Sequence, residues 1–330
     1  MRLASARELK QTVVTRLIVA NETVIRAARL SVATTEHKRL SRINRTVALG
    51  VSPYGKEYRL AVRVQEQALL DSPVVDRIRK EARGEIDVRF VGRIRKRQAP
   101  WYRCSQRPLL IGTSIGHHDV TAGTIGAMVK KRRSNDPLVL SNNHVLANED
   151  RARVGDVILQ PGSLDGGRRR TSGVGSLLAF VRLTAAKPNR VDAAVAELDR
   201  DVPFDPTKLR GLGRLAGLGP SAIEDGARVA KIGRTTGLTK GRVTAFEIDN
   251  VVVEYDRGNL VFNGQIEIEG ASSRPFSDGG DSGSLIVNAD QQAIALLFAG
   301  TDSGGRSNRG LTYANPIGEV LSQLRVELFV

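Results

Sequence analysis

From about residue 108 onward the chain alternates short apolar runs with clusters of glycine, asparagine, aspartate and proline, and this pattern limits the folds available to it. Twelve such runs follow one another, from TIGAMV (124–129) to LTYAN (311–315). Short apolar runs bounded by turn-forming residues are typical of antiparallel strands. We therefore expect two consecutive all-β barrels, followed by a helix over residues 316–328.

The amino-terminal part of the chain follows a different pattern. Between residues 3 and 30, apolar side chains recur mostly at intervals of three, four or seven among arginines and lysines, which indicates an amphipathic helix. Residues 58–65 and 86–94 alternate as strands, and residues 72–84 open with Ser-Pro as a helix does. We expect a small helix-plus-βαβ module. The expected domains are residues 1–100 (module and basic connector), 101–210 (first barrel) and 211–330 (second barrel and helix).

Composition excludes several classes of protein. Hydrophobic residues make up 41% of the chain and charged residues 26%, which argues against wholesale disorder. No apolar run approaches the roughly 18 residues that a membrane-spanning helix needs. Cys104 is the single cysteine, so an intrachain disulfide and a thiolate metal cluster are both excluded. The amino terminus, MRLASARELKQ, carries charges where a signal peptide needs an apolar core, so we expect a cytoplasmic protein that does not contact membranes.

The net charge of +15 is concentrated near the amino terminus. Residues 1–100 contain 22 Lys and Arg against 10 Asp and Glu, a surplus of 12 positive charges. A basic segment can bind nucleic acid or acidic partners, but a solvated basic helix is the more common explanation, so nucleic acid is a minor alternative. The apolar stripe over residues 3–30 is long for so small a module, and we expect it to pack against a second copy of the chain.

The segment FSDGGDSGSLIV (276–287) carries the strongest chemical signal. Glycines on both sides of Ser282 leave room for backbone amides to converge on one point, as the stabilisation of an oxyanion requires. A serine hydroxyl is a weak nucleophile by itself. It needs a base within hydrogen-bond reach, and that base needs a carboxylate to orient it.

The four histidines can be searched one by one for this base. Only His144 follows a strand with a buried pattern, in LVLSNNHVLA. Asp192 begins the apolar run VDAAVAEL, where neighbouring side chains would hold its carboxylate away from water. The candidate catalytic residues therefore occur in the order His144, Asp192, Ser282.

These residues resemble those of the chymotrypsin-like (trypsin-fold) serine peptidases, whose triad runs in this order. GDSGS resembles the nucleophile motif of that family, NNHV its histidine motif in the bacterial high-temperature-requirement proteases, and VDAAVAEL its aspartate strand. The wider pattern over about residues 108–326 is similar to trypsin-like proteins related to the plant narrow-leaf protein. This resemblance implies two antiparallel six-stranded barrels and a serine endopeptidase that acts on protein or peptide substrates without a cofactor.

Carried over residue by residue, the resemblance makes Ser282 the nucleophile, His144 the base and Asp192 the group that fixes the imidazole. It implies an oxyanion hole formed by the backbone amides of Gly280 and Ser282. It also suggests a substrate pocket that contains Phe276, Phe298 and Gly300. Because Phe276 stands where trypsin-like specificity needs an aspartate, a preference for Lys or Arg is not expected.

Two other positions depart from the pattern of the digestive enzymes. Ser284 stands in place of a glycine. Phe298 stands where those enzymes place a serine that supports the triad carboxylate, so Asp192 needs another partner. The barrels also follow about 100 residues of chain, so activation by cleavage at their start is not expected.

Two competing interpretations accompany the peptidase hypothesis. His117, His118 and Asp119 could bind a metal ion, but adjacent side chains on an extended strand point in opposite directions, so no metal site is expected. The barrels could instead serve as a binding scaffold, with the basic amino-terminal module recruiting an acidic protein or a nucleic acid.

Overall fold

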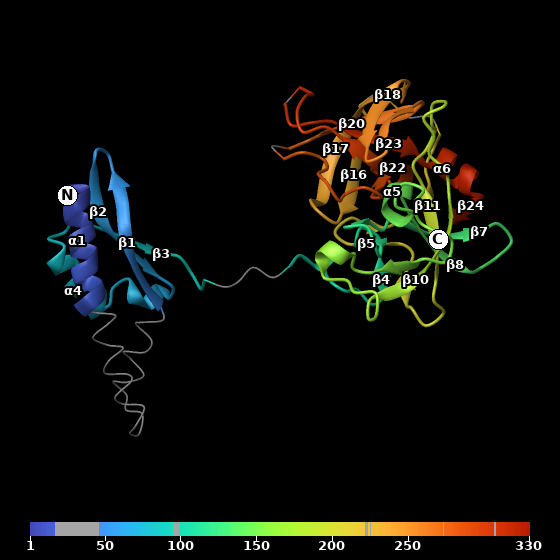
Figure 1. The fold of residues 1–330 in the computed structure, drawn as a ribbon. Coiled ribbons are helices and arrows are strands. Elements are labelled where there is room, and N and C mark those ends of the chain that lie inside the picture. Colours follow the sequence, from blue (N-terminus) through green and yellow to red (C-terminus); the bar gives the residue numbers. More distant parts are fainter. Residues whose placement is uncertain (17–45, 95–98, 222–223, 225, 273, 307) are drawn as a thin grey trace. The chain divides into compact units, whose positions relative to one another are not determined.

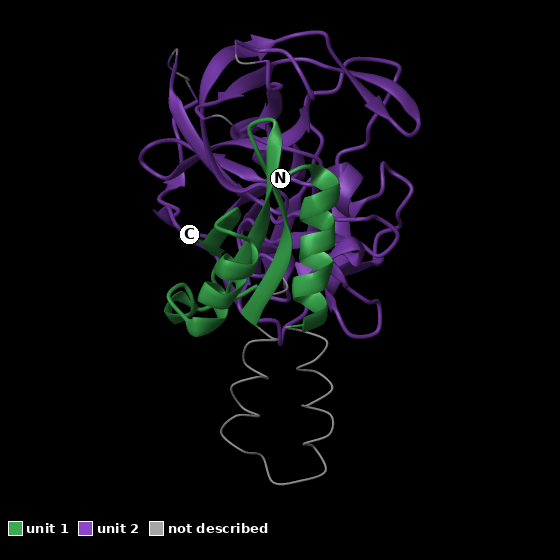
Figure 2. Ribbon diagram, turned by 90° about the vertical axis from the view of Figure 1, so that its left-hand side faces the viewer, with its two compact units in different colours: residues 1–98 green, residues 99–330 purple. Residues whose placement is uncertain are grey.

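The computed structural model describes residues 1–16, 46–94, 99–221, 224, 226–272, 274–306 and 308–330. The chain divides into two compact units, Met1–Gln98 and Ala99–Val330, which Figure 2 shows in green and purple. No helix within the described ranges is both long enough and apolar enough to span a membrane.

In its described residues, the first unit contains a three-stranded sheet and two α-helices. Its elements are α1 (Leu3–Val14), β1 (Val47–Tyr54), β2 (Glu57–Val64), η2 (Gln67–Leu69), α4 (Pro73–Glu81) and β3 (Ile86–Phe90). β2 pairs antiparallel with β1 and parallel with β3, so the expected βαβ unit is confirmed, and β1 adds a hairpin that was not predicted. Ser72 caps α4 by accepting a hydrogen bond from the amide of Val75.

The amino-terminal helix is confirmed over Leu3–Val14, where Val13 packs into the core of this unit. Leu17, Val24 and Ala28, which carry the rest of the expected stripe, lie outside the described residues. Self-association through residues 3–30 therefore stays a prediction.

The second unit is built mainly of strands (Figure 1). Its first part contains η3 (Trp101–Arg103), β4 (Leu109–Leu110), β5 (Ser114–His117), β6 (Gly123–Thr124), β7 (Ala127–Lys131), β8 (Pro137–Ser141), α5 (Asn143–Leu146), β9 (Val157–Leu159), η4 (Ser163–Asp165), β10 (Gly173–Phe180), β11 (Ala194–Leu198), β12 (Phe204–Asp205) and β13 (Lys208–Leu209). Its second part contains β14 (Gly213–Arg214), β15 (Gly217–Leu218), β16 (Arg228–Gly233), β17 (Gly237–Ile248), β18 (Val251–Tyr255), β19 (Gly258–Phe262), β20 (Gln265–Gly270), β21 (Leu285–Val287), β22 (Gln292–Gly300), β23 (Thr312–Pro316), α6 (Ile317–Leu324) and β24 (Val326–Leu328).

The sheet topology is that of a trypsin-like double barrel, as expected. β16, β17, β20, β21, β22 and β23 form a closed ring of six strands, because β22 pairs with both β21 and β23. The first sheet runs in the order β24-β7-β8-β11-β10-β9-β5-β6 and forms a half-barrel. Each of the twelve predicted runs contains strand residues, although β18 pairs with β19 in a separate hairpin instead of entering a barrel.

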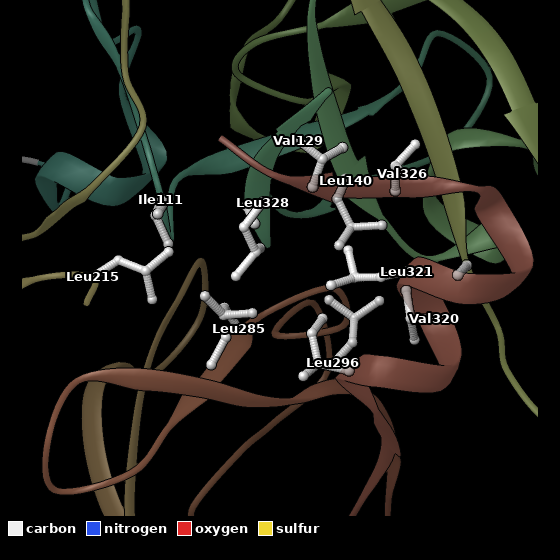
Figure 3. Packing of buried hydrophobic residues seen from close by; sticks show 14 of the residues in the cluster. Ile111, Val129, Leu140, Leu215, Leu285, Leu296, Val320, Leu321, Val326 and Leu328 are labelled. Carbon is white, nitrogen blue, oxygen red and sulfur yellow. The ribbon is translucent and has the colours of Figure 1, made fainter. Parts of the chain in front are cut away.

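A shared apolar core joins the two barrels (Figure 3). Val129 and Leu140 come from the first sheet, Leu285 and Leu296 from the second, and all four are buried. Because the same cluster holds side chains of both sheets, the barrels stabilise each other through burial of apolar surface.

The carboxyl-terminal segment packs against this core, and its structure differs in part from the expected helix. The helix was expected over residues 316–328, but α6 ends at Leu324, and Arg325 adopts a left-handed conformation with φ 56°. The chain then continues as β24, which pairs with β7 of the first sheet and buries Val326 and Leu328. The segment therefore runs from one barrel to the other.

We predict that Leu328→Ala destabilises the barrel unit by about 2–4 kcal/mol, because it removes buried methyl groups from the shared core and leaves a cavity. Denaturant unfolding of the full chain, followed by the fluorescence of its single tryptophan, Trp101, measures this change in the barrel unit. Val330→Ala is the matched control, since Val330 is 64% exposed. Equal midpoints for the two variants would contradict the prediction.

Candidate active site

The structure joins His144 to Asp192. His144 lies on α5, the short helix that follows β8, and its Nδ1 is 2.5 Å from Oδ2 of Asp192. The backbone amide of His144 also donates to Oδ1 of the same carboxylate, at 3.2 Å. The Asp192 side chain has no solvent exposure, whereas that of His144 is 23% exposed. The carboxylate thus holds the imidazole by its inner nitrogen and leaves the other nitrogen for chemistry.

Asp192 has a further partner that the sequence did not reveal. The hydroxyl of Tyr255 donates to Oδ2 of Asp192 at 2.7 Å. The main chain of Asp192 is also fixed, because Asn142 donates to its carbonyl oxygen and Asn315 accepts from its amide. The sequence carried one clue, since Phe298 occupies the place of a supporting serine. It did not indicate which residue replaces that serine.

Asp192 and His144 each stabilise the charged form of the other side chain. Burial alone would lower the pKa of His144, but the charge of Asp192 and their hydrogen bond outweigh it, so the pKa of His144 is raised. Burial alone would raise the pKa of Asp192, and here the charge of His144 and the hydrogen bonds from His144 and Tyr255 lower it. Asp192 is therefore a carboxylate whenever it orients the imidazole.

The loop before Ser282 leaves two backbone amides without an acceptor. Among the described residues, neither the amide of Gly280 nor that of Ser282 donates a hydrogen bond. The carbonyl oxygen that shares a peptide plane with the Gly280 amide belongs to Gly279, and it accepts from the Thr235 hydroxyl at 2.6 Å. Because the peptide unit is planar and trans, this bond turns the Gly280 N–H to the opposite side.

The Ser282 amide is oriented in the same manner. Its peptide plane includes the carbonyl of Asp281, which accepts from both the hydroxyl and the amide of Ser284, at 2.6 and 3.0 Å. Ser284, one of the departures from the digestive-enzyme pattern, thus supplies a donor that a glycine lacks. Gly280 itself has φ 93°, and a Cβ there would lie 2.7 Å from the Thr235 hydroxyl, so this position requires glycine.

The loop that carries Ser282 is anchored by a buried ion pair. Asp281 and Lys231 both have no exposed side-chain surface, and Nζ of Lys231 lies 3.0 Å from Oδ2 of Asp281. Oδ1 of Asp281 accepts from the amides of Thr235 and Thr236, and the Thr236 hydroxyl also contacts Lys231. Burial lowers the pKa of Lys231, and the charge of Asp281 opposes this effect. The loop around Ser282 therefore depends on a charge supplied from β16.

Strand β6 connects the loop that carries Ser282 to the region of His144. The amide of Thr124 donates to the carbonyl of Ser282 at 2.8 Å, and the Thr124 hydroxyl donates to the carbonyl of Gly280 at 3.0 Å. A Cβ on Gly123 would lie 2.4 Å from Val145, the neighbour of His144, and 3.0 Å from the Ser282 carbonyl. Within the described parts of the chain, no hydrogen bond joins the Ser282 hydroxyl to the His144 ring, so that contact belongs to the proposal below.

A pocket of about 390 Å³ opens beside Ser282. It is lined by Pro275, Ser277, Asp278, Gly279, Ser282, Leu297, Ala299, Gly300, Thr301, Asp302 and Arg309. Gly300, which was predicted to belong to a substrate pocket, is among the residues that line this one. Phe276 and Phe298 were also predicted there, but neither lines this pocket, and both are buried in apolar clusters. Their aromatic side chains are too apolar to stay in a solvated pocket when the barrel core can bury them.

The expectation that the side chains of His117 and His118 point in opposite directions is wrong. β5 ends at His117, and the turn that follows brings the two rings to 4.1 Å between centroids. Their ligand atoms and those of Asp119 all lie within 4.8 Å of one another. However, His117 bonds Asp156 through Nε2 and accepts the amide of Asp119 through Nδ1, each at 3.1 Å. A metal ion bound by His117 would have to displace one of these hydrogen bonds.

We predict that Lys231→Met lowers the stability of the barrel unit by about 3–5 kcal/mol, because it leaves the Asp281 carboxylate buried and unpaired. Lys130→Met is the matched control, since Lys130 is partly exposed and lies 3.4 Å from Glu327, and such pairs contribute at most about 1 kcal/mol. Unfolding followed by Trp101 fluorescence measures both variants. The interpretation fails if the two lysine variants lose equal stability.

Part of the chain is similar in sequence to known proteins. Residues 215–317 match the family described as the Nal1 C-terminal domain. The rice (Oryza sativa subsp. japonica) protein NARROW LEAF 1 is 27% identical over 250 residues, which cover 66% of this chain and 42% of the rice protein. The matched part thus spans less than half the length of that relative.

Solved structures of serine proteases also match the chain. Protease A of Thermobifida fusca matches with 18% identity and a TM-score of 0.45, covering 66% of this chain and 97% of its own. A glutamic acid-specific serine protease matches with 20% identity and a TM-score of 0.48, covering 67% and 100%. The resemblance to chymotrypsin-like serine peptidases, and to proteins related to the narrow-leaf protein, is confirmed.

Proposed function

We propose that this chain is a serine endopeptidase that hydrolyses peptide bonds through an acyl-enzyme formed on Ser282. The observation that carries the proposal is the buried Asp192 carboxylate bonded to Nδ1 of His144, which leaves Nε2 as a base. The loop that carries Ser282 is hydrogen-bonded to Thr124 of β6, and Gly123 of the same strand lies against Val145, the neighbour of His144, which supports the proposal. The proposed substrates are proteins or peptides, and the reaction needs no cofactor.

In the first half of the reaction, Nε2 of His144 takes the proton of the Ser282 hydroxyl as Oγ attacks the scissile carbonyl carbon. The resulting tetrahedral oxyanion accepts hydrogen bonds from the amides of Gly280 and Ser282, and each such donor typically contributes about 3 kcal/mol. The intermediate then expels the amine, which takes the proton from His144. An ester between Ser282 and the acyl half of the substrate remains.

In the second half, His144 takes a proton from a water molecule as that water attacks the ester carbonyl. The same two amides hold the second oxyanion. When this intermediate collapses, Ser282 recovers its proton from His144 and the carboxylic acid product leaves. Throughout the cycle Asp192 stays ionised, fixes the imidazole tautomer and stabilises the imidazolium that forms. The side chain before the scissile bond would occupy the pocket beside Ser282.

A fluorophosphonate probe should label wild-type protein at Ser282, because the probe needs only the activated hydroxyl and the oxyanion donors. Ser282→Ala and His144→Ala should abolish labelling, and Ser176→Ala, a serine of β10, should not change it. Mass spectrometry of the intact chain measures the adduct, and Trp101 fluorescence confirms that each variant is folded. Folded wild-type protein that stays unlabelled would reject the proposal and favour the binding-scaffold alternative.

The labelling rate should depend on the protonation of His144. Protonated His144 cannot accept the serine proton, so the rate is low below its pKa and rises as the pH passes through it. Because Asp192 raises this pKa, the midpoint should lie above the ordinary histidine value of about 6.5. Rates measured between about pH 5 and pH 9 test this directly. A midpoint below that value, or a flat profile, is incompatible with His144 as the base.

A further inference from the structure

Asp192 depends on a tyrosine that lies outside both barrels. Tyr255 is the last residue of β18, and β18 pairs only with β19 among the described strands, in a two-stranded hairpin. Its side chain is almost fully buried, and its hydroxyl bonds Oδ2 of Asp192, the same oxygen that holds His144. Burial, reinforced by the charge of Asp192, raises the pKa of Tyr255 well above its usual value. The phenol is therefore a permanent donor to the carboxylate.

Aromatic packing seats the tyrosine in this position. The ring of Tyr255 meets that of His144 edge-on, with centroids 6.0 Å apart, and it stacks on Phe262 at the end of β19. Phe262 in turn packs against Phe298, with centroids 4.7 Å apart. Phe298 thus occupies the place of the expected serine and supports the hairpin that delivers the replacement donor.

Partly exposed ion pairs and a backbone hydrogen bond link the tip of the hairpin to the loop after His144. Arg257 lies 2.8 Å from Oδ2 of Asp150, and Asp256 lies 2.8 Å from Nη2 of Arg151. The amide of Asp256 also donates to the carboxylate of Glu149. These contacts join the residue next to Tyr255 to a loop only a few residues beyond the catalytic base.

The loop itself needs such support. Asn148, Glu149 and Asp150 have φ values of 48°, 55° and 67°. This is a left-handed backbone conformation that residues other than glycine rarely adopt. Asp150 accepts hydrogen bonds from Asn143, the neighbour of His144, and from the amide of Leu183. Strain of this kind persists only where the surroundings hold it in place, as Asp150 and the hairpin tip do here.

We propose that Tyr255 is a positioning residue for the Asp192–His144 pair, and that the β18–β19 hairpin, clamped at its tip by Arg257 and Asp150, delivers it. This inference rests on the proposed peptidase function. The hydroxyl disperses the charge of Asp192 and fixes the carboxylate, so that the imidazole stays aligned with Ser282. Loss of the clamp loosens the hairpin and weakens the same hydrogen bond.

The first test is Tyr255→Phe, which keeps the ring and its packing and removes only the hydroxyl. Because a hydrogen bond to a charged group is lost, the labelling rate of Ser282 should fall about tenfold or more. With the charge of Asp192 less dispersed, the pKa of His144 should rise and the pH midpoint should move upward. Tyr313→Phe is the matched control, since that hydroxyl bonds Glu267 and not the catalytic pair. A structural loss alone would not move the pH midpoint.

The clamp is tested with Arg257→Met. If the clamp acts by delivering Tyr255, this variant slows labelling and shifts the midpoint in the same direction. The double variant Arg257→Met/Tyr255→Phe should then be no slower than Tyr255→Phe alone. Additive effects would show that the clamp acts independently of the tyrosine and would overturn the delivery role.

Titration of the histidine resonances of the full chain by NMR separates this inference from the proposed function. A raised His144 midpoint in Tyr255→Phe but not in Tyr313→Phe supports the positioning role even if wild-type protein is never labelled. If wild-type protein is labelled and Tyr255→Phe matches it in rate and midpoint, the peptidase function stands and the positioning role is wrong.

Discussion

The site depends on two carboxylates, Asp192 and Asp281, whose negative charges are buried without any solvent exposure and must be stabilised by neighbouring groups. A carboxylate removed from water is tolerated only where donors or opposite charges surround it. Asp192 finds its donors in His144 and Tyr255, and Asp281 finds them in Lys231 and the turn after it. Each carboxylate thereby fixes a group that the proposed chemistry uses: the imidazole in one case, the nucleophile loop in the other.

The barrel strands and the candidate site residues could largely be predicted, because local sequence patterns indicate them. Apolar runs between turn residues identify strands wherever one face of each strand is buried, so the barrel strands could be located without knowing their partners. His144 was found because it follows such a run, and Asp192 because it begins one. The glycines around Ser282 likewise indicated a loop in which backbone amides point at one place.

The features that escaped prediction depend on partners distant in sequence. Lys231 is the charged residue inside the strand run ARVAKI, and only its pairing with Asp281 explains its complete burial. Tyr255 ends a run that was expected to enter a barrel, and no local signal shows that β18 pairs with β19 instead. The alternation of side chains failed to describe His117 and His118 because β5 ends at His117. Alternation holds only within a strand, and it does not indicate where the strand ends.

The two amides beside Ser282 show how the assembly of the barrels bears on the chemistry. Most groups that orient them belong to the second barrel: Lys231 holds Asp281, Thr235 holds the carbonyl of Gly279, and Ser284 holds that of Asp281. Thr124 is different, because it comes from the first sheet and bonds the carbonyls of both Gly280 and Ser282. Consecutive peptide planes are linked through a single Cα atom. A shift of Thr124 would therefore turn the carbonyls of Gly280 and Ser282, and the neighbouring peptide planes, which carry the amides of Gly280 and Ser282, would turn with them. Because the shared apolar core sets the position of one sheet against the other, the orientation of these two amides follows from how the two barrels pack.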